Sequence, residues 1–143
     1  MADSVIDTSV VSMANGQIAG RRRGNVLDRR LSAIEDVAYG RRRLRYNPKL
    51  LVEYQRIVRA YRNDVIELFF IALTERAVFV RRNTLSRQDN AKARKCKWPG
   101  HDQHLLAAAV GGIQPTIFVT ESHLHACAAS VLACFAVHVE HLC

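Results

Sequence analysis

Segments of β-strand character alternate with helical segments along the chain, and this alternation constrains the fold more than any other feature. Apolar runs of strand type occur at residues 5–11, 43–46, 77–80, 116–120 and 136–139. Apolar residues recur at helical spacing within residues 25–39, 48–62, 63–73, 102–110 and 122–133. Such alternation favours an α/β domain with a parallel sheet covered by helices on both faces. Residues 16–24 and 81–100 are polar or basic, and we interpret them as loops.

The composition narrows the class of protein. The 143 residues are 49% hydrophobic, which excludes a disordered chain, and no apolar run reaches the roughly 18 residues of a membrane span. The first 20 residues contain Asp3 and Asp7 but no Lys or Arg, which is atypical of a signal peptide. We therefore expect a cytoplasmic protein with no membrane partner.

Charge is distributed unevenly along the chain. The formal net charge is +8, and the positive excess is concentrated in residues 21–62. Residues 98–143 hold all 6 histidines and neither Lys nor Arg. A basic flank beside an acidic, histidine-containing segment favours an anionic partner, although a solvated basic surface would give the same pattern.

The 4 cysteines show no CxxC spacing, so we expect reduced thiols rather than disulfides. Cys127 and Cys134 lie in an Ala-rich apolar run that is typical of a protein core. A zinc site made by Cys96, His101 and His104 is conceivable, but it lacks a fourth ligand and a paired-cysteine motif. The spacing does not favour such a site.

Polar residues directly follow two of the expected strands. Asp7 and Ser9 follow the first apolar pair, and Thr120, Glu121 and Ser122 follow the TIFV run. Ligands of open parallel sheets gather beyond the carboxyl ends of the strands, so these positions suit a functional site. The alternative for each residue is a helix cap or a turn.

Two carboxylates fall on helix faces that should meet the core. Glu53 lies three residues after Leu50 and four before Ile57, and Asp102 begins the stripe that Leu105 and Leu106 continue. A role as helix N-cap is the alternative for Asp102. If Asp7, Glu53 and Asp102 converge, Mg²⁺ or Mn²⁺ would offset their repulsion, because these ions prefer oxygen ligands. Such a site beside a basic surface favours phosphodiester hydrolysis.

These segments resemble the PIN-domain nucleases, in the family's order over nearly the whole chain. VIDTSVV (residues 5–11) resembles the opening strand with its aspartate, and RLRYNPKLLVEYQRIV (residues 43–58) resembles the segment that carries the family's glutamate, here Glu53. HDQHLLAAAVGG (residues 101–112) resembles the helix that begins with the third acid, Asp102. IFVTES (residues 117–122) resembles the fourth motif. The resemblance implies one three-layer α/β/α sandwich over residues 1–143, with a central, mostly parallel sheet.

The fourth motif departs from the family pattern. The family usually has Thr, any residue and Asp, which would place the Asp at Ser122, whereas the acid of this chain is Glu121. Three interpretations remain open. Glu121 reaches the metal, Ser122 ligates it through its hydroxyl or a water, or the site is weakened and the protein only binds RNA or a protein partner. Ser9 and Thr120 match supporting positions of the family.

The resemblance implies a Mg²⁺- or Mn²⁺-dependent endoribonuclease of the kind found as toxins in toxin–antitoxin pairs. It implies RNA as substrate, a small antitoxin protein as partner and, in many members, a homodimer. Asp7, Glu53 and Asp102 would be catalytic and bind the metal, with Glu121 or Ser122 completing the ligands. Two basic runs are candidate phosphate contacts: Arg21, Arg22, Arg23, Arg41, Arg42 and Arg43. We expect surface or supporting roles for His101, His104, His123 and His125.

Overall fold

The computed structural model describes residues 1–20, 24–57 and 62–142. The five strands within these ranges pair in parallel in the order β3-β2-β1-β4-β5. The strands are β1 (Asp3–Ile6), β2 (Arg43–Tyr46), β3 (Val78–Phe79), β4 (Thr116–Val119) and β5 (His138–His141). The expected α/β class with a parallel central sheet is therefore confirmed.

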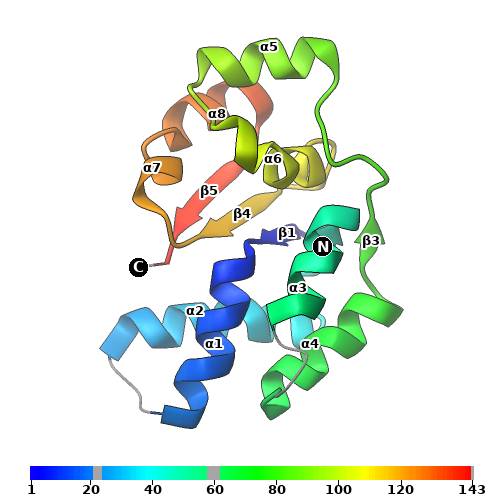
Figure 1. Cartoon of the computed structure of the whole chain (residues 1–143), viewed down its shortest axis with the longest axis vertical. Coiled ribbons are helices and arrows are strands. Elements are labelled where there is room, and N and C mark those ends of the chain that lie inside the picture. The colour runs from blue at the N-terminus through cyan, green and yellow to red at the C-terminus, as the bar shows by residue number, and fades with distance from the viewer. Residues whose placement is uncertain (21–23, 58–61, 143) are drawn as a thin grey trace.

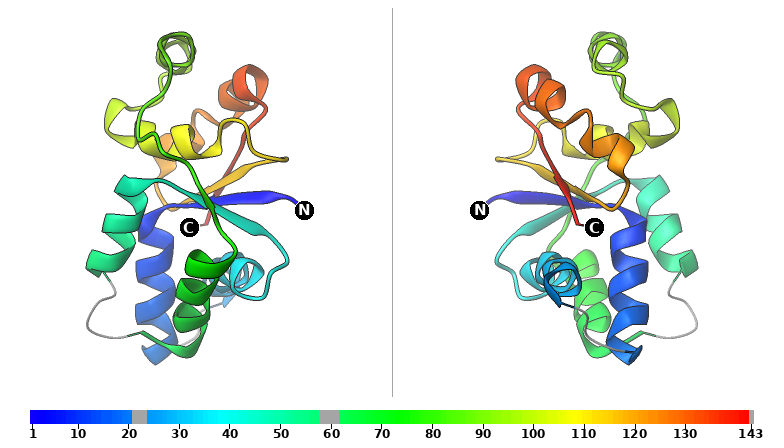
Figure 2. Two further views of the ribbon diagram at one scale, coloured as in Figure 1. Left: turned by 90° about the vertical axis from the view of Figure 1, so that its right-hand side faces the viewer. Right: turned by 90° about the vertical axis from the view of Figure 1, so that its left-hand side faces the viewer.

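Helices cover both faces of the sheet and complete a three-layer α/β/α sandwich (Figures 1 and 2). One layer contains α1 (Thr8–Gly20), α2 (Gly24–Ala38), α3 (Pro48–Ile57) and α4 (Asp64–Glu75). The other contains α5 (Arg87–Lys95), α6 (Gln103–Ala109), α7 (Ser122–His125) and α8 (Ala128–Phe135), and the 3₁₀ turn η1 (Gly100–Asp102) precedes α6. Over the described ranges, no helix is both long enough and apolar enough to cross a membrane.

The core lies where the central strands meet both helix layers. Val5 and Ile6 of β1 and Ile117 and Val119 of β4 are fully buried. Their burial on both sides explains why these strands are continuous apolar runs rather than alternating ones. Short strands of this kind end together at one edge of the sheet, which fixes where the residues that follow them lie.

Two expected helix starts are confirmed by capping hydrogen bonds. Asn47 accepts the backbone N–H of Leu50 at 3.2 Å, and Pro48 occupies the first position of α3. Asn63 accepts the N–H of Ile66 at 2.9 Å and caps α4. Asn47 also donates through Nδ2 to the backbone oxygen of His104 at 2.9 Å, so it ties α3 to α6.

Some boundaries differ from the sequence-based expectation. Val10 and Val11 lie in α1 rather than in a strand, because there they join the buried face of a helix. Of the loop expected at 16–24, residues 16–20 belong to α1, Gly24 begins α2, and 21–23 lie outside the described residues. The expected loop at 81–100 contains α5, which Ser86 caps by accepting the N–H of Asp89 at 3.2 Å. Ala93 is the buried residue of that helix, so no apolar periodicity revealed it.

The carboxyl-terminal part also differs in detail. The single helix expected at 122–133 is two helices, α7 and α8, and the last strand begins at His138 rather than at Ala136. Ala136 adopts a left-handed conformation with φ 55°, which ends α8 and delays the strand. Cys127 is buried as expected, but Cys134 is exposed.

A buried tyrosine ties α3 to the first strand. The ring of Tyr54 is fully buried against Phe69 in a T-shaped contact, and its hydroxyl donates to the backbone oxygen of Ile6. Because Glu53 is the preceding residue of α3, this bond also fixes where the Glu53 side chain enters the structure.

We expect Tyr54→Phe to lower the free energy of unfolding by about 1–3 kcal/mol, because the change removes a donor from a buried carbonyl oxygen. Urea denaturation measures this difference. Tyr39→Phe is the matched control, since Tyr39 is 52% exposed. Equal stability of Tyr54→Phe and the wild type would show that the hydroxyl does not hold α3 in place.

Candidate functional site

The candidate site lies at the carboxyl edge of the sheet, where the chain leaves β1 and β4. These two strands pair with each other, and β2 flanks β1 on its other side. Asp7 follows β1, and its backbone N–H donates to the backbone oxygen of Phe118 in β4 at 3.0 Å. Thr120 and Glu121 follow β4. The structure thus places Asp7, Thr120 and Glu121 at the carboxyl ends of the central strands, where the sequence predicts them.

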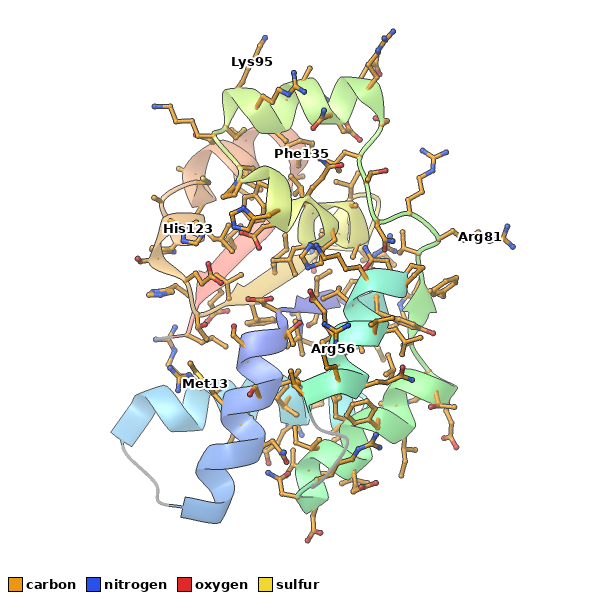
Figure 3. All side chains as sticks on the ribbon, in the orientation of Figure 1. Met13, Arg56, Arg81, Lys95, His123 and Phe135 are labelled. Atoms are coloured by element: carbon orange, nitrogen blue, oxygen red, sulfur yellow. The ribbon has the colours of Figure 1, made fainter. Side chains whose placement is uncertain are left out.

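A cleft of about 520 Å³ opens at this edge, and all four candidate acids line it: Asp7, Glu53, Asp102 and Glu121. They come from four separate segments, namely the ends of β1 and β4, helix α3 and the turn η1. Lys49 and Arg56 of α3 line the same cleft (Arg56 is labelled in Figure 3). The fold thus brings together carboxylates that are up to 114 positions apart in a chain of 143 residues.

Asp7 is the most constrained of these acids, with 8% of the residue exposed. Its Oδ1 accepts the backbone N–H of Thr8 at 2.8 Å, and its Oδ2 accepts the hydroxyl of Ser9 at 2.9 Å. The Ser9 hydroxyl in turn accepts from the Thr120 hydroxyl at 2.8 Å. Ser9 and Thr120 therefore form a hydrogen-bonded chain that leads to Asp7, at the positions where the resemblance implies supporting residues.

The surroundings of Asp7 make its ionisation unfavourable. Burial raises the pKa of Asp7 from 3.8 to about 6, and the negative charges of Asp102 and Glu121 add to this rise. The hydrogen bonds from Ser9 and Thr8 act in the opposite direction but do not cancel it. The raised pKa therefore reflects mainly the burial of Asp7 and, to a smaller extent, the neighbouring acids.

Glu53 faces the cleft from α3. Its Oε1 accepts the Thr8 hydroxyl at 2.8 Å and lies 3.5 Å from Nε2 of His104. His104 is buried, and loss of solvation lowers its pKa, although Glu53 favours the protonated form. Glu53 therefore borders the core through His104 and reaches the cleft through its carboxylate, as its helical position predicts.

Asp102 is buried, with 8% of the residue exposed, and its side chain makes no capping hydrogen bond at the start of α6. Asp102 thus occupies the N-cap position of α6, as the alternative expects, but its carboxylate does not cap the helix. Its backbone oxygen accepts the indole N–H of Trp98 at 2.8 Å, which fixes the turn. Its Oδ2 is buried and has no hydrogen-bond partner among the described residues. An unsatisfied buried carboxylate oxygen is unfavourable unless a cation contacts it.

Glu121 and Ser122 have different positions. The Glu121 carboxylate lines the cleft and lies 3.1 Å from Nε2 of His123. Ser122 begins α7, is exposed, and is not part of the cleft lining. Of the two candidates for the fourth ligand, the structure brings only Glu121 to the other acids.

Histidines surround these acids more closely than the sequence suggests. Nε2 of His101 lies 3.1 Å from Oδ2 of Asp102, and Nε2 of His123 lies 3.6 Å from the same oxygen. His101 precedes Asp102 directly, so that part of the group was visible in the sequence. His123 approaches from α7, directly after the fourth motif, but its contact with Asp102 could not be read from the sequence.

The conceivable zinc site with Cys96 does not form within the part of the chain that the structure describes. Cys96 neighbours Cys134 and Cys127, and burial together with these thiols raises the pKa of Cys96 to about 11. His104 points to Glu53 instead. The three proposed zinc ligands therefore have other surroundings.

The candidate phosphate contacts at 41–43 lie at the other end of the sheet. Arg42 donates to the Ser4 hydroxyl and the Asp3 backbone oxygen, both at 2.6 Å, and Arg43 pairs with the Asp3 carboxylate at 2.9 Å. Arg41 pairs with Asp36 at 2.7 Å. These bonds join the amino ends of β1 and β2, so they lie away from the acidic cleft. Arg21, Arg22 and Arg23 lie outside the described residues.

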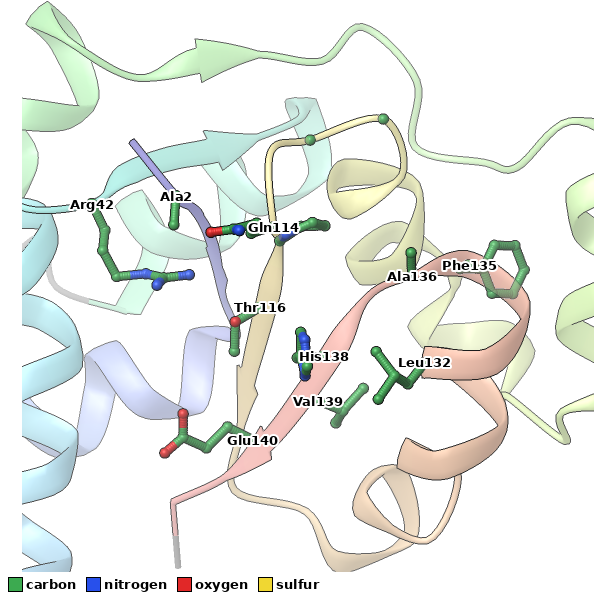
Figure 4. A pocket seen from close by; sticks show the side chains of 13 residues that line it. Ala2, Arg42, Gln114, Thr116, Leu132, Phe135, Ala136, His138, Val139 and Glu140 are labelled. Carbon is green, nitrogen blue, oxygen red and sulfur yellow. The ribbon is translucent and has the colours of Figure 1, made fainter.

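A larger hollow of about 920 Å³ also opens at that amino end, and Arg42, Thr116, His138 and Glu140 are among its lining residues (Figure 4). Its lining contains neither Asp7 nor the other three acids. Arg42 contributes a guanidinium that already bonds to Ser4 and Asp3. Because the four acids line the smaller cleft and not this hollow, the smaller cleft is the candidate functional site.

The donor set of the smaller cleft fits a divalent cation. Four carboxylates supply oxygen ligands, and the buried Oδ2 of Asp102 makes no hydrogen bond with a described residue that a bound ion would have to replace. Oxygen ligands of this kind suit Mg²⁺ or Mn²⁺. Asp7, Glu53, Asp102 and Glu121 are the residues that would hold the ion.

A comparison of the chain with protein-family models found no match, and comparisons with curated proteins and with solved structures found no similar protein.

The raised pKa of Asp7 predicts a pH-dependent stability in the absence of metal. The folded protein holds the Asp7 proton up to about pH 6, whereas the unfolded chain releases it near 3.8. The bound proton therefore contributes fully to the free energy of unfolding below pH 3.8, and this contribution is lost as the pH rises to 6. Asp7→Asn should thus be more stable than the wild type by about 1–3 kcal/mol above pH 6, and this difference should vanish near pH 4.

Chemical denaturation in EDTA at pH 4, 6 and 8 measures the difference. Asp64→Asn is the control, because Asp64 is exposed at the start of α4. A difference between Asp7→Asn and the wild type that does not change with pH would contradict the electrostatic cause.

Proposed function

We propose that the protein is a Mg²⁺- or Mn²⁺-dependent endoribonuclease that hydrolyses RNA phosphodiester bonds. The observation that supports this most is the convergence of Asp7, Glu53, Asp102 and Glu121 in one cleft at the carboxyl edge of β1 and β4. The resemblance of the four sequence segments to PIN-domain nucleases supports the same activity, since each segment contributes one of these acids.

Each residue has a role that follows from its contacts. Asp7, Glu53 and Asp102 would hold the ion, while Thr8 and Ser9 orient the Asp7 and Glu53 carboxylates through hydrogen bonds. A bound divalent ion would activate a water molecule and stabilise charge on the phosphate. Lys49 and Arg56, at the rim, would attract the RNA backbone without reading its sequence.

We also propose, from the same resemblance, that the protein is the toxin of a toxin–antitoxin pair with a small protein antitoxin and that it forms a homodimer. A small reading frame beside the gene would supply the candidate antitoxin. Co-purification of the two products tests the pairing, and sedimentation of the isolated chain tests the dimer.

Asp7→Asn and Asp102→Asn should each reduce metal-dependent RNA cleavage by at least about a hundredfold. Mutation of residues that only support metal ligands already reduces activity by about ten- to a hundredfold. Cleavage of a labelled RNA with Mg²⁺ or Mn²⁺ measures the loss, and a DNA of the same sequence tests the preference for RNA. Asp64→Asn should cleave like the wild type. Undiminished cleavage by both cleft variants would exclude the proposed active site.

The positions of Glu121 and Ser122 predict which of them replaces the usual fourth acid. Glu121→Gln should reduce cleavage by about tenfold or more, because its carboxylate lines the cleft. Ser122→Ala should cleave normally, because its side chain is outside the cleft lining. The reverse order of effects would assign the ligand to Ser122.

The second candidate function is RNA binding or partner binding without cleavage. The observation that favours it is the exposed Ser122 at the place where the family has its fourth acid. This function predicts RNA binding that weakens with salt and no cleavage at any concentration of divalent ion. The same assay therefore separates the two candidates.

A further inference from the structure

Two histidines and an aspartate form a compact group on one side of the acidic cleft. Each of His101, Asp102 and His123 offers one ligand atom, and these three atoms lie within 4.8 Å of one another. His101 and Asp102 belong to η1, whereas His123 belongs to α7 (labelled in Figure 3). The group therefore joins two segments of the same helix layer.

The Asp102 carboxylate shows that this group is more than neighbouring surface residues. Oδ2 of Asp102 is buried and lacks a hydrogen bond, even though Nε2 of His101 and Nε2 of His123 lie at 3.1 and 3.6 Å. Both imidazoles direct a nitrogen toward one oxygen. One cation bound by both nitrogens and the oxygen would satisfy the buried oxygen.

The type of ligand atom selects the type of ion. Mg²⁺ prefers oxygen ligands only, whereas imidazole nitrogen suits zinc and other first-row transition metals. Two nitrogens and one carboxylate leave a coordination position open, as in zinc sites with three protein ligands. The exposed faces of His101 and His123, whose side chains are 75% and 49% exposed, give an ion access from solvent.

We propose that His101, Asp102 and His123 form a transition-metal site that takes Zn²⁺ in preference to Mg²⁺. Glu121 is the next available donor, since its Oε2 lies 3.1 Å from Nε2 of His123. The site shares Asp102 with the carboxylate group but uses nitrogen ligands that group does not contain. It rests on this geometry alone and holds whether or not the protein cleaves RNA.

The thiols are the competing zinc ligands in this chain. Cys96 and Cys127 are buried, and burial raises the pKa of both thiols, which keeps them protonated at neutral pH. Cys134 is exposed and neighbours Cys96. A cysteine variant therefore belongs in the experiment.

The test is isothermal titration calorimetry of the full chain with Zn²⁺ and separately with Mg²⁺ at pH 7.5. His123→Gln and His101→Gln should each weaken Zn²⁺ binding by about tenfold or more, which corresponds to the loss of one good ligand. Mg²⁺ binding should change little in the same variants. His138→Gln is the matched control, because His138 is an exposed histidine at the opposite end of the sheet.

Cys134→Ser should leave Zn²⁺ binding unchanged. Equal Zn²⁺ affinity of the wild type and of both the His101 and the His123 variant would overturn the proposal, and so would the absence of saturable Zn²⁺ binding. Circular dichroism verifies that each variant folds. We expect both histidine variants to fold, because the side chains of His101 and His123 are exposed. Because the readout is binding, loss of RNA cleavage in the Asp7 variant neither supports nor contradicts this result.

Discussion

The burial of carboxylates at the carboxyl edge of β1 and β4 is the constraint on which the site depends. Asp7 and Asp102 are each only 8% exposed, so solvent screens their charges poorly. The pairing of β1 with β4 places the Asp7 and Glu121 positions side by side, and the packing of α3 and α6 adds Glu53 and Asp102. A fold that holds this arrangement without a cation loses stability at neutral pH, which is the usual cost of a functional site.

The carboxylates on the two sides of the cleft have different neighbours. Glu53 and Asp7 are held by hydroxyl and backbone donors from the start of α1, whereas Asp102 and Glu121 are flanked by His101 and His123. Asp102 belongs to both groups. The cleft thus combines ligands for a hard ion with ligands for a transition metal, and which ion it binds depends on the histidines as much as on the acids.

The sequence predicts the helical positions best where periodicity and capping agree. Asn47-Pro48 indicates the start of α3, and the spacing from Leu50 to Tyr54, both buried, places Glu53 beside the core. Ile57, expected on the same face, is instead 38% exposed near the end of the helix. The prediction of a strand at Val10 and Val11 was wrong, because β-branched residues next to a strand also fit a buried helix face. The approach of His123 to Asp102 depends on how α7 packs beyond β4, and no short-range pattern encodes such a contact. Asp3 is fully buried and pairs with Arg43. This ion pair likewise depends on the register of β1 and β2, which no short-range pattern encodes.

The most direct test of a divalent-ion site among these acids is anomalous diffraction from a crystal equilibrated with Mn²⁺. The account predicts an anomalous peak in the cleft, in contact with carboxylate oxygens of Asp7 and Asp102. A crystal at saturating Mn²⁺ with these carboxylates in place and no peak between them would contradict it.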